Sequence, residues 1–156
     1  MIKINILDEK EIKCYISRKY PDDKQNDAVI SVNASEINNF FKGEDKNNWF
    51  VIEYLGPINS IANYLSLLTY KTFLKYFVEI ILPECGTIED ATVVTTELIR
   101  ANAYEEADSI LCVNVDSRLL QGEIGFRIIV PKYNYVDMWN KKNPVTHTER
   151  KLRNDT

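Results

Sequence analysis

The longest apolar run of the chain extends from Pro57 to Leu82 (PINSIANYLSLLTYKTFLKYFVEIIL), and a run of this length belongs in a core. Gly56 and Pro57 precede it, and proline suits the first turn of a helix. The apolar spacing therefore predicts helix, but the apolar stripe changes sides between Thr69 and Thr72. Either the helix breaks or kinks there, or one continuous helix packs against different neighbours along its length.

The chain before this run has the patterns of short strands and one helix. Apolar residues occupy alternate positions in 2–7 and in 11–18, which predicts an opening β-hairpin. A polar loop and a short strand over 28–32 are expected next. Asn33-Ala34-Ser35-Glu36 has the spacing of a capping box and predicts a short helix that ends near Gly43.

Two further patterns flank the long run. Trp49–Leu55 is rich in aromatic and β-branched residues and predicts a central strand. Thr87-Ile88-Glu89-Asp90 resembles a second helix start, although the β-branched residues of 92–96 are equally compatible with a strand. The segments after Leu82 are predicted as a helix over 87–107, a hairpin of strands 109–116 and 123–130, and a last helical turn or two over 134–140.

These elements together indicate one α+β domain over residues 1–143. The expected architecture is a mostly antiparallel sheet of about six strands, with two to four helices packed on one face. Residues 144–156 are polar and are expected to form a flexible C-terminal tail.

The sequence contains no catalytic motif and no pattern typical of a metal or cofactor site. The three cysteines, Cys14, Cys85 and Cys112, lie far apart, and the single histidine, His147, has no neighbour at metal-ligand spacing. Cys14 and Cys112 are expected to be small core residues within strands. An odd number of isolated cysteines suits a reducing compartment and, with no signal-sequence pattern at the start, favours a cytoplasmic protein.

Charge and polarity bear on the class of partner. The net charge of −4 and the pI of about 5.1 argue against direct binding to nucleic acid or to an anionic membrane. The long apolar run is also too polar to span a bilayer. From Glu84 to Asp116 acidic residues dominate, with Arg100 as the one base. Such a face steers a basic protein towards it, although an ordinary solvated helix has the same composition.

The residues predicted to bind a partner are acidic residues of this segment and two aromatic residues near the C-terminus. They are Glu89, Asp90, Glu97, Glu105, Glu106, Asp108, Tyr133 and Trp139. Tyrosine and tryptophan are favoured as interface anchors.

In size, acidity and lack of catalytic motifs, the chain is similar to the small immunity proteins and inhibitors that neutralise bacterial toxins. That resemblance implies a non-enzymatic protein that covers the basic active site of a toxin or effector with an acidic surface. The alternative is a small ligand-binding domain or enzyme, with a pocket between the central helix and the sheet and polar groups from Tyr104, Arg118 or Arg127. A homodimer formed through the edge of the predicted hairpin is a third possibility.

Overall fold

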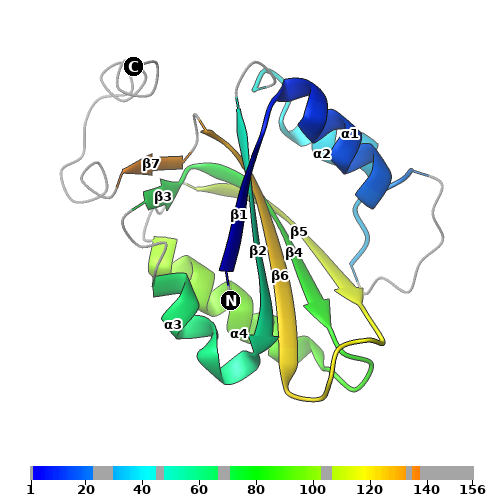
Figure 1. Cartoon of the computed structure of the whole chain (residues 1–156), viewed down its shortest axis with the longest axis vertical. Coiled ribbons are helices and arrows are strands. Elements are labelled where there is room, and N and C mark those ends of the chain that lie inside the picture. Colours follow the sequence, from blue (N-terminus) through cyan, green and yellow to red (C-terminus); the bar gives the residue numbers. More distant parts are fainter. Residues whose placement is uncertain are drawn as a thin grey trace.

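A five-stranded mixed sheet forms the centre of the protein, with the strand order β1-β2-β6-β4-β5 (Figure 1). The structure is a computed structural model that describes residues 2–22, 30–44, 48–66, 71–102, 107–132 and 135–137. The strands are β1 (Ile2–Leu7), β2 (Trp49–Pro57), β4 (Lys75–Leu82), β5 (Asp108–Val115) and β6 (Glu123–Pro131). Only β4 and β5 are parallel. The predicted α+β class and mostly antiparallel sheet are confirmed, with five strands in place of about six.

Helices cover both faces of this sheet, so the prediction that they pack on one face is wrong (Figure 1). One face carries α1 (Glu9–Lys19) and α2 (Ala34–Phe40), and the other carries α3 (Ile61–Ser66) and α4 (Ile88–Asn102). A single 3-10 turn (Ile58–Ser60) leads into α3. A small second sheet pairs β3 (Lys71–Phe73) with β7 (Tyr135–Asp137). Two-sided cover is needed because strands such as β4 are apolar on both faces.

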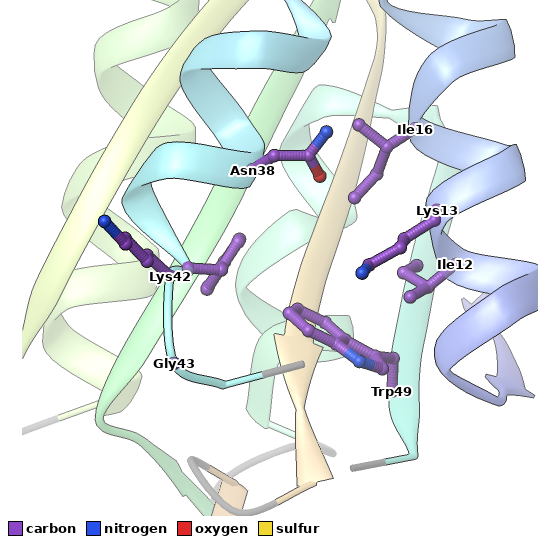
Figure 2. A pocket seen from close by; sticks show the side chains of 8 residues that line it. Ile12, Lys13, Ile16, Asn38, Lys42, Gly43 and Trp49 are labelled. Carbon is purple, nitrogen blue, oxygen red and sulfur yellow. The ribbon is translucent and has the colours of Figure 1, made fainter. Parts of the chain in front are cut away.

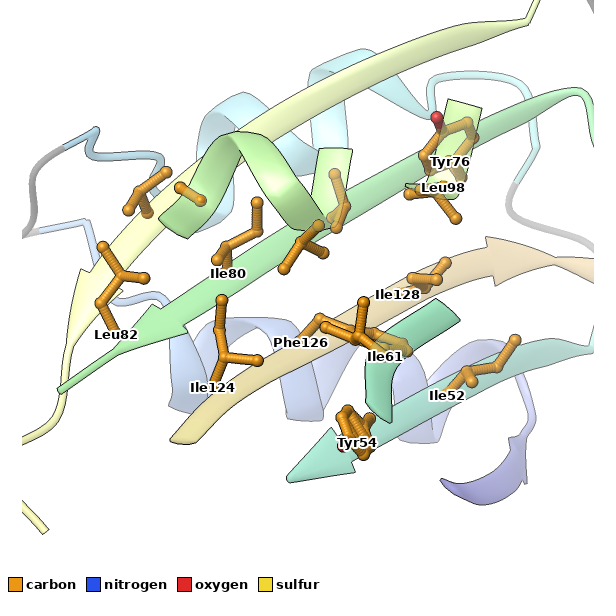
Figure 3. Packing of buried hydrophobic residues seen from close by; sticks show 14 of the residues in the cluster. Ile52, Tyr54, Ile61, Tyr76, Ile80, Leu82, Leu98, Ile124, Phe126 and Ile128 are labelled. Atoms are coloured by element: carbon orange, nitrogen blue, oxygen red, sulfur yellow. The ribbon is translucent and has the colours of Figure 1, made fainter. Parts of the chain in front are cut away.

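Two hydrophobic clusters fill the layers on either side of the sheet. Under α3 and α4, Ile61 and Leu98 pack onto sheet residues that include Ile80 and Phe126 (Figure 3). Under α1 and α2, the fully buried residues include Ile12, Ile16, Ile37 and Phe77. Burial on this scale contributes about 1.5–3 kcal/mol for each large apolar side chain.

The predicted helix over 57–82 is wrong in its second half. Its first half forms the short α3, but Lys75–Leu82 is β4, the strand between β6 and β5. Every residue from Tyr76 to Ile80 is buried. A short apolar run buried on both faces has no period that separates strand from helix.

The opening hairpin is also wrong in its second strand, since residues 9–19 form α1. Asp8 caps this helix, and its side chain accepts a hydrogen bond from the Glu11 backbone N–H at 2.8 Å. Ile12 and Ile16 face the core at helical spacing, while Cys14, predicted to be a core residue, is exposed. The strand prediction mistook an i, i+4 pattern for an alternating one.

The predicted hairpin of 109–116 and 123–130 consists of two real strands that do not pair with each other. β4 lies between β5 and β6, so β5 instead pairs in parallel with β4 through the α4 crossover. Residues 92–96 are helical and belong to α4. Residues 135–137 form strand β7 in place of the predicted helical turn.

Several local predictions are confirmed. Asn33 and Glu36 form the expected capping box of α2. Gly43, just beyond that helix, has a φ of +92°, a conformation that other residues rarely adopt. Trp49–Leu55 is part of β2. The predicted strand at 28–32 is not confirmed: Ile30 forms an isolated antiparallel bridge with Val113, residues 31 and 32 are not in a strand, and residues 28 and 29 lie outside the described residues. Residues 138–156, including the predicted tail, lie outside the described residues.

No helix in the described part of the chain has the length and apolar character needed to cross a membrane.

Candidate functional site

A row of charged side chains crosses the middle of the sheet on the α1/α2 face. Arg127 of β6 lies directly opposite Glu53 of β2 on one side and opposite Glu79 of β4 on the other. Directly opposed residues of neighbouring strands point to the same face, so the three side chains meet there. Phe126, the residue before Arg127, points to the other face and belongs to the cluster under α3 and α4.

Glu79 is the buried acid of this row, with 5% of its surface exposed. Its Oε1 accepts a hydrogen bond from the Tyr20 hydroxyl at 2.8 Å and forms an ion pair with Nη1 of Arg127. Its Oε2 accepts a hydrogen bond from the side-chain amide of Asn114. A buried carboxylate is tolerated when it is paired and hydrogen-bonded in this way.

Arg127 links the two carboxylates. Its Nε and Nη2 donate to Oε2 of Glu53 at 3.2 and 3.0 Å, and its Nη1 reaches Glu79. Burial alone lowers the pKa of the guanidinium, but the nearby oxygens of Tyr20 and Glu79 outweigh this effect and raise the pKa. Arg127 is therefore a permanent positive charge held between two acids.

The weakly acidic groups around this row are held in their protonated forms. Burial, reinforced by the charge of Glu79, raises the pKa of Tyr20 well above its ordinary value and that of Cys112 to about 12. Burial also raises the pKa of Tyr15 to about 12, and its hydroxyl has no hydrogen-bond partner within the described residues. None of the three is a nucleophile or a general base at neutral pH.

The row forms the floor of an open recess, which we call the polar basin. It consists of two adjoining cavities of about 530 and 320 Å³ that share Ile81, Asp116, Arg118 and Arg127. The larger cavity is also lined by the C-terminal end of α1, by 31–33 and by Glu79 and Asn114. The smaller one is lined by residues of β1, β2, β6 and the loop after β5, among them Lys3, Glu53, Leu55, Leu119 and Gly125.

The rim of the polar basin is ordered by its own hydrogen bonds. Arg118 donates from Nε and Nη2 to the two carboxylate oxygens of Asp116 at 3.0 and 2.8 Å. The hydrogen bond from the Arg118 side chain is the largest cause that lowers the pKa of Asp116, to about 2. On the other side, Asp22 accepts from the backbone N–H and the hydroxyl of Ser35, which lowers the pKa of Asp22. The recess is thus shaped before any ligand arrives.

A smaller, mostly apolar pocket of about 290 Å³ lies between α1 and α2 (Figure 2). Ile12, Lys13 and Ile16 enter it from α1, and the Trp49 ring lies between the two helices. The Trp49 indole N–H is buried and has no hydrogen-bond partner in the described ranges. Because that nitrogen is sealed from solvent, a ligand in the pocket gains no donor from it.

Three of the acids predicted to bind a partner lie on α4, on the other side of the sheet from the polar basin. Glu89, Asp90 and Glu97 fall on the outward side of α4, where Glu89 is exposed and the other two are half-buried. Asp90 also accepts a hydrogen bond from the Thr87 backbone N–H at 3.0 Å and so caps the helix. Asp108 starts β5 directly opposite Lys75. Glu105, Glu106, Tyr133 and Trp139 lie outside the described residues.

The alternative prediction, a pocket with polar groups from Tyr104, Arg118 or Arg127, can be compared with the structure for two of these residues. Arg118 and Arg127 do line one recess, while Tyr104 lies outside the described residues. The recess is on the α1/α2 face of the sheet and not between a central helix and the sheet, because the second half of that predicted helix is β4. Glu79 and Glu53 were not singled out from sequence. The available signal was the charge of Glu79 within the apolar run KYFVEIIL, because a buried charge requires a partner.

No group of three or more histidine, cysteine, aspartate or glutamate side chains in the described part of the chain is arranged to hold a metal ion.

The comparisons with known proteins concern the fold. No family model and no curated protein matches the sequence. Among solved structures, the chain is similar to TubZ of Bacillus thuringiensis serovar israelensis in its GDP-form protofilaments, with a TM-score of 0.50 and 8% identity over 86% of this chain and 39% of TubZ. It is also similar to the empty FtsZ dimer of M. jannaschii, with a TM-score of 0.48 and 13% identity over 67% of this chain and 32% of FtsZ.

Thiamine monophosphate kinase of Aquifex aeolicus has a TM-score of 0.34 and 10% identity over 80% of this chain and 43% of the kinase. The chain therefore spans less than half the length of each of these three proteins. The likeness to TubZ concerns the fold alone, and the two lower scores carry no argument about function.

Proposed function

We propose that the protein is a non-enzymatic module that binds another protein, in the manner of an inhibitor or immunity-type protein, and that the polar basin is its contact site. The observation that carries the proposal is the saturated charge row beneath the basin. Glu79, Arg127 and Tyr20 are already engaged with one another, and the nearby thiol and phenols stay protonated. Such a floor offers fixed charges for recognition but no group ready to move a proton.

The surroundings of the polar basin favour a protein partner. Leu55 and Leu119 line the smaller cavity, and Leu55 is exposed. Leu120 follows in the same loop and is 69% exposed. Exposed apolar side chains beside a charged recess match the mixture of apolar contact and charge found in protein interfaces. The acidic outward side of α4 remains the competing contact surface, since it would suit a basic partner.

A capture experiment compares the two surfaces directly. The tagged full chain is used to purify a partner from the native host, and the same experiment is repeated with two charge-altered variants. The basin variant is Arg118→Glu with Leu120→Asp, and both positions are exposed enough to spare the fold. The matched control is Glu89→Lys with Glu97→Lys on α4.

The proposal expects one protein to be captured at near-stoichiometric amounts by the wild type and the α4 variant and lost with the basin variant. Loss with the α4 variant alone would move the contact to the acidic face. Turnover of a small molecule by the purified chain would contradict the non-enzymatic role.

A second candidate function is the binding of a small charged ligand in the same recess. The larger cavity, at about 530 Å³, is within the usual range for ligand sites, and Arg118, Asp116 and Lys19 bring both signs of charge to its lining. Thermal unfolding with a panel of amino acids, dicarboxylates and nucleotides tests this candidate. A ligand of the basin raises the Tm of the wild type but not that of Arg118→Ala.

A further inference from the structure

Within the described part of the chain, no strand pairs with the outer edge of β1. β1 is the terminal strand of the main sheet, and its one partner in the described residues is β2. The opposite edge is protected in its middle, because Ile30 and Val113 exchange backbone hydrogen bonds of 3.1 and 2.9 Å beside β5. An open edge presents unpaired N–H and C=O groups and is a template for another strand.

β1 also carries exposed isoleucines on a single face. Ile4 is 47% exposed and Ile6 is 62% exposed. They lie opposite Ile52 and Phe50 of β2, on the face covered elsewhere by α3 and α4. The core on that side thus continues to the edge of the sheet, where no described helix or strand covers it.

The usual protections of an edge strand are weak in β1. The strand pairs with β2 without a bulge from Ile2 to Leu7 and contains no proline. Its one charged residue, Lys3, points to the face opposite the isoleucines. An edge that is apolar, regular and uncovered is suited to pairing with a further strand.

We propose that two copies of the chain pair antiparallel through β1, about a twofold axis at Ile4. In this register Ile4 opposes Ile4 of the second copy, and Ile2 opposes Ile6 of the second copy. Lys3 then opposes the neutral Asn5 of the second copy, so no like charges face each other. Two other registers are less favourable. With the axis at Lys3, the lysines of the two copies would lie opposite each other, and with the axis at Asn5, the apolar Ile2 would lie opposite the charged Asp8 of the second copy.

This pairing joins the two sheets into one of ten strands. The twofold axis is perpendicular to the joined sheet, so both polar basins open on the same face. The strand contact is smaller than a standard interface of about 1,600 Å², and we therefore expect a dimer that dissociates at micromolar concentrations.

Sedimentation velocity of the full chain over a hundredfold range of concentration tests the association. The wild type is expected to shift from monomer to dimer. Ile4→Lys places two lysines opposite each other on the axis and is expected to weaken dimerisation about tenfold or more. Val93→Lys, at an exposed site on α4, is the control and should leave the association unchanged. A wild type that is monomeric at every concentration overturns the proposal, as does equal dimerisation of Ile4→Lys.

Disulfide trapping tests the register and does not depend on the charge variant. In a background with Cys14→Ser and Cys85→Ser, the two exposed thiols are removed and only the buried one remains. Ile4→Cys then brings two Cα atoms about 4.5–5.5 Å apart across the axis, which permits a disulfide. In Ile6→Cys the two thiols are four positions out of register, roughly 14 Å along the strand. Rapid dimer formation by Ile4→Cys alone is expected, and equal or faster trapping by Ile6→Cys overturns the register.

Discussion

Replacing Arg127 with methionine removes the positive charge that lies between Glu53 and Glu79. In the described residues no other cation contacts Glu79, which is 5% exposed. Breaking a buried pair by deleting one partner costs about 3–5 kcal/mol, because the remaining charge stays desolvated. Glu53 contributes less to this cost because 31% of its side chain is exposed and can be solvated by water. For a domain with a free energy of unfolding of about 5–15 kcal/mol, the loss is a large fraction of the total.

Guanidinium unfolding followed by circular dichroism measures this loss. Glu53→Gln is the matched control and is expected to cost about 0–1 kcal/mol, as for an exposed ion pair. Adding Glu79→Gln to Arg127→Met should restore about half of the lost stability, because a neutral amide needs no counter-ion. Its oxygen takes the place of the acceptor for Asn114, and its NH2 group can donate to the Tyr20 hydroxyl oxygen. A cost below about 1 kcal/mol for Arg127→Met, or a further loss in the double variant, would refute the buried-pair reasoning.

Three further outcomes follow from the local structure. Burial holds the pKa of Cys112 at about 12, so a thiol reagent at pH 8 should label the two exposed cysteines quickly and Cys112 only after unfolding. The hydrogen bond from Arg118 holds the pKa of Asp116 at about 2, so the stability it contributes is full above about pH 4 and is lost as the pH falls through 2. Arg118→Ala should return the carboxyl titration, followed by NMR, towards about 3.9. Asn33→Ala should lower the free energy of unfolding by about 1 kcal/mol through loss of the α2 cap.

Local signals in the sequence predicted local structure well. The capping box of Asn33 and Glu36 and the aromatic run of β2 are both where the pattern placed them. The same kind of signal was present at the start of α1, where Asp8 and Glu11 form a capping box. It was outweighed by the apparent alternation of Ile12, Cys14 and Ile16, although only the two isoleucines are buried.

Long-range pairing could not be derived from these patterns. β5 and β6 are adjacent in sequence and have the alternation of a hairpin, yet β4 lies between them. The position of β4 between β5 and β6 can be predicted only if residues 75–82 are predicted as a strand, and their apolar spacing instead predicted a helix. The charged row was missed for the same reason. On a helix Glu79 would face solvent and need no partner, whereas in the middle of the sheet its buried charge needs Arg127.

The charged row across β2, β6 and β4 also determines how these three strands can align. If β4 slid by two residues along β6, Glu79 would oppose either Ile129 or Gly125 and would keep its burial without a counter-ion. A slip by one residue would turn Glu79 into the layer beneath α4. Hydrophobic strands as uniform as KYFVEIIL have little else to distinguish one alignment from the next. Arg127, with an acid on either side, thus favours one register of the three strands. In any shifted register Glu79 lacks its counter-ion, so the shifted pairing is destabilised.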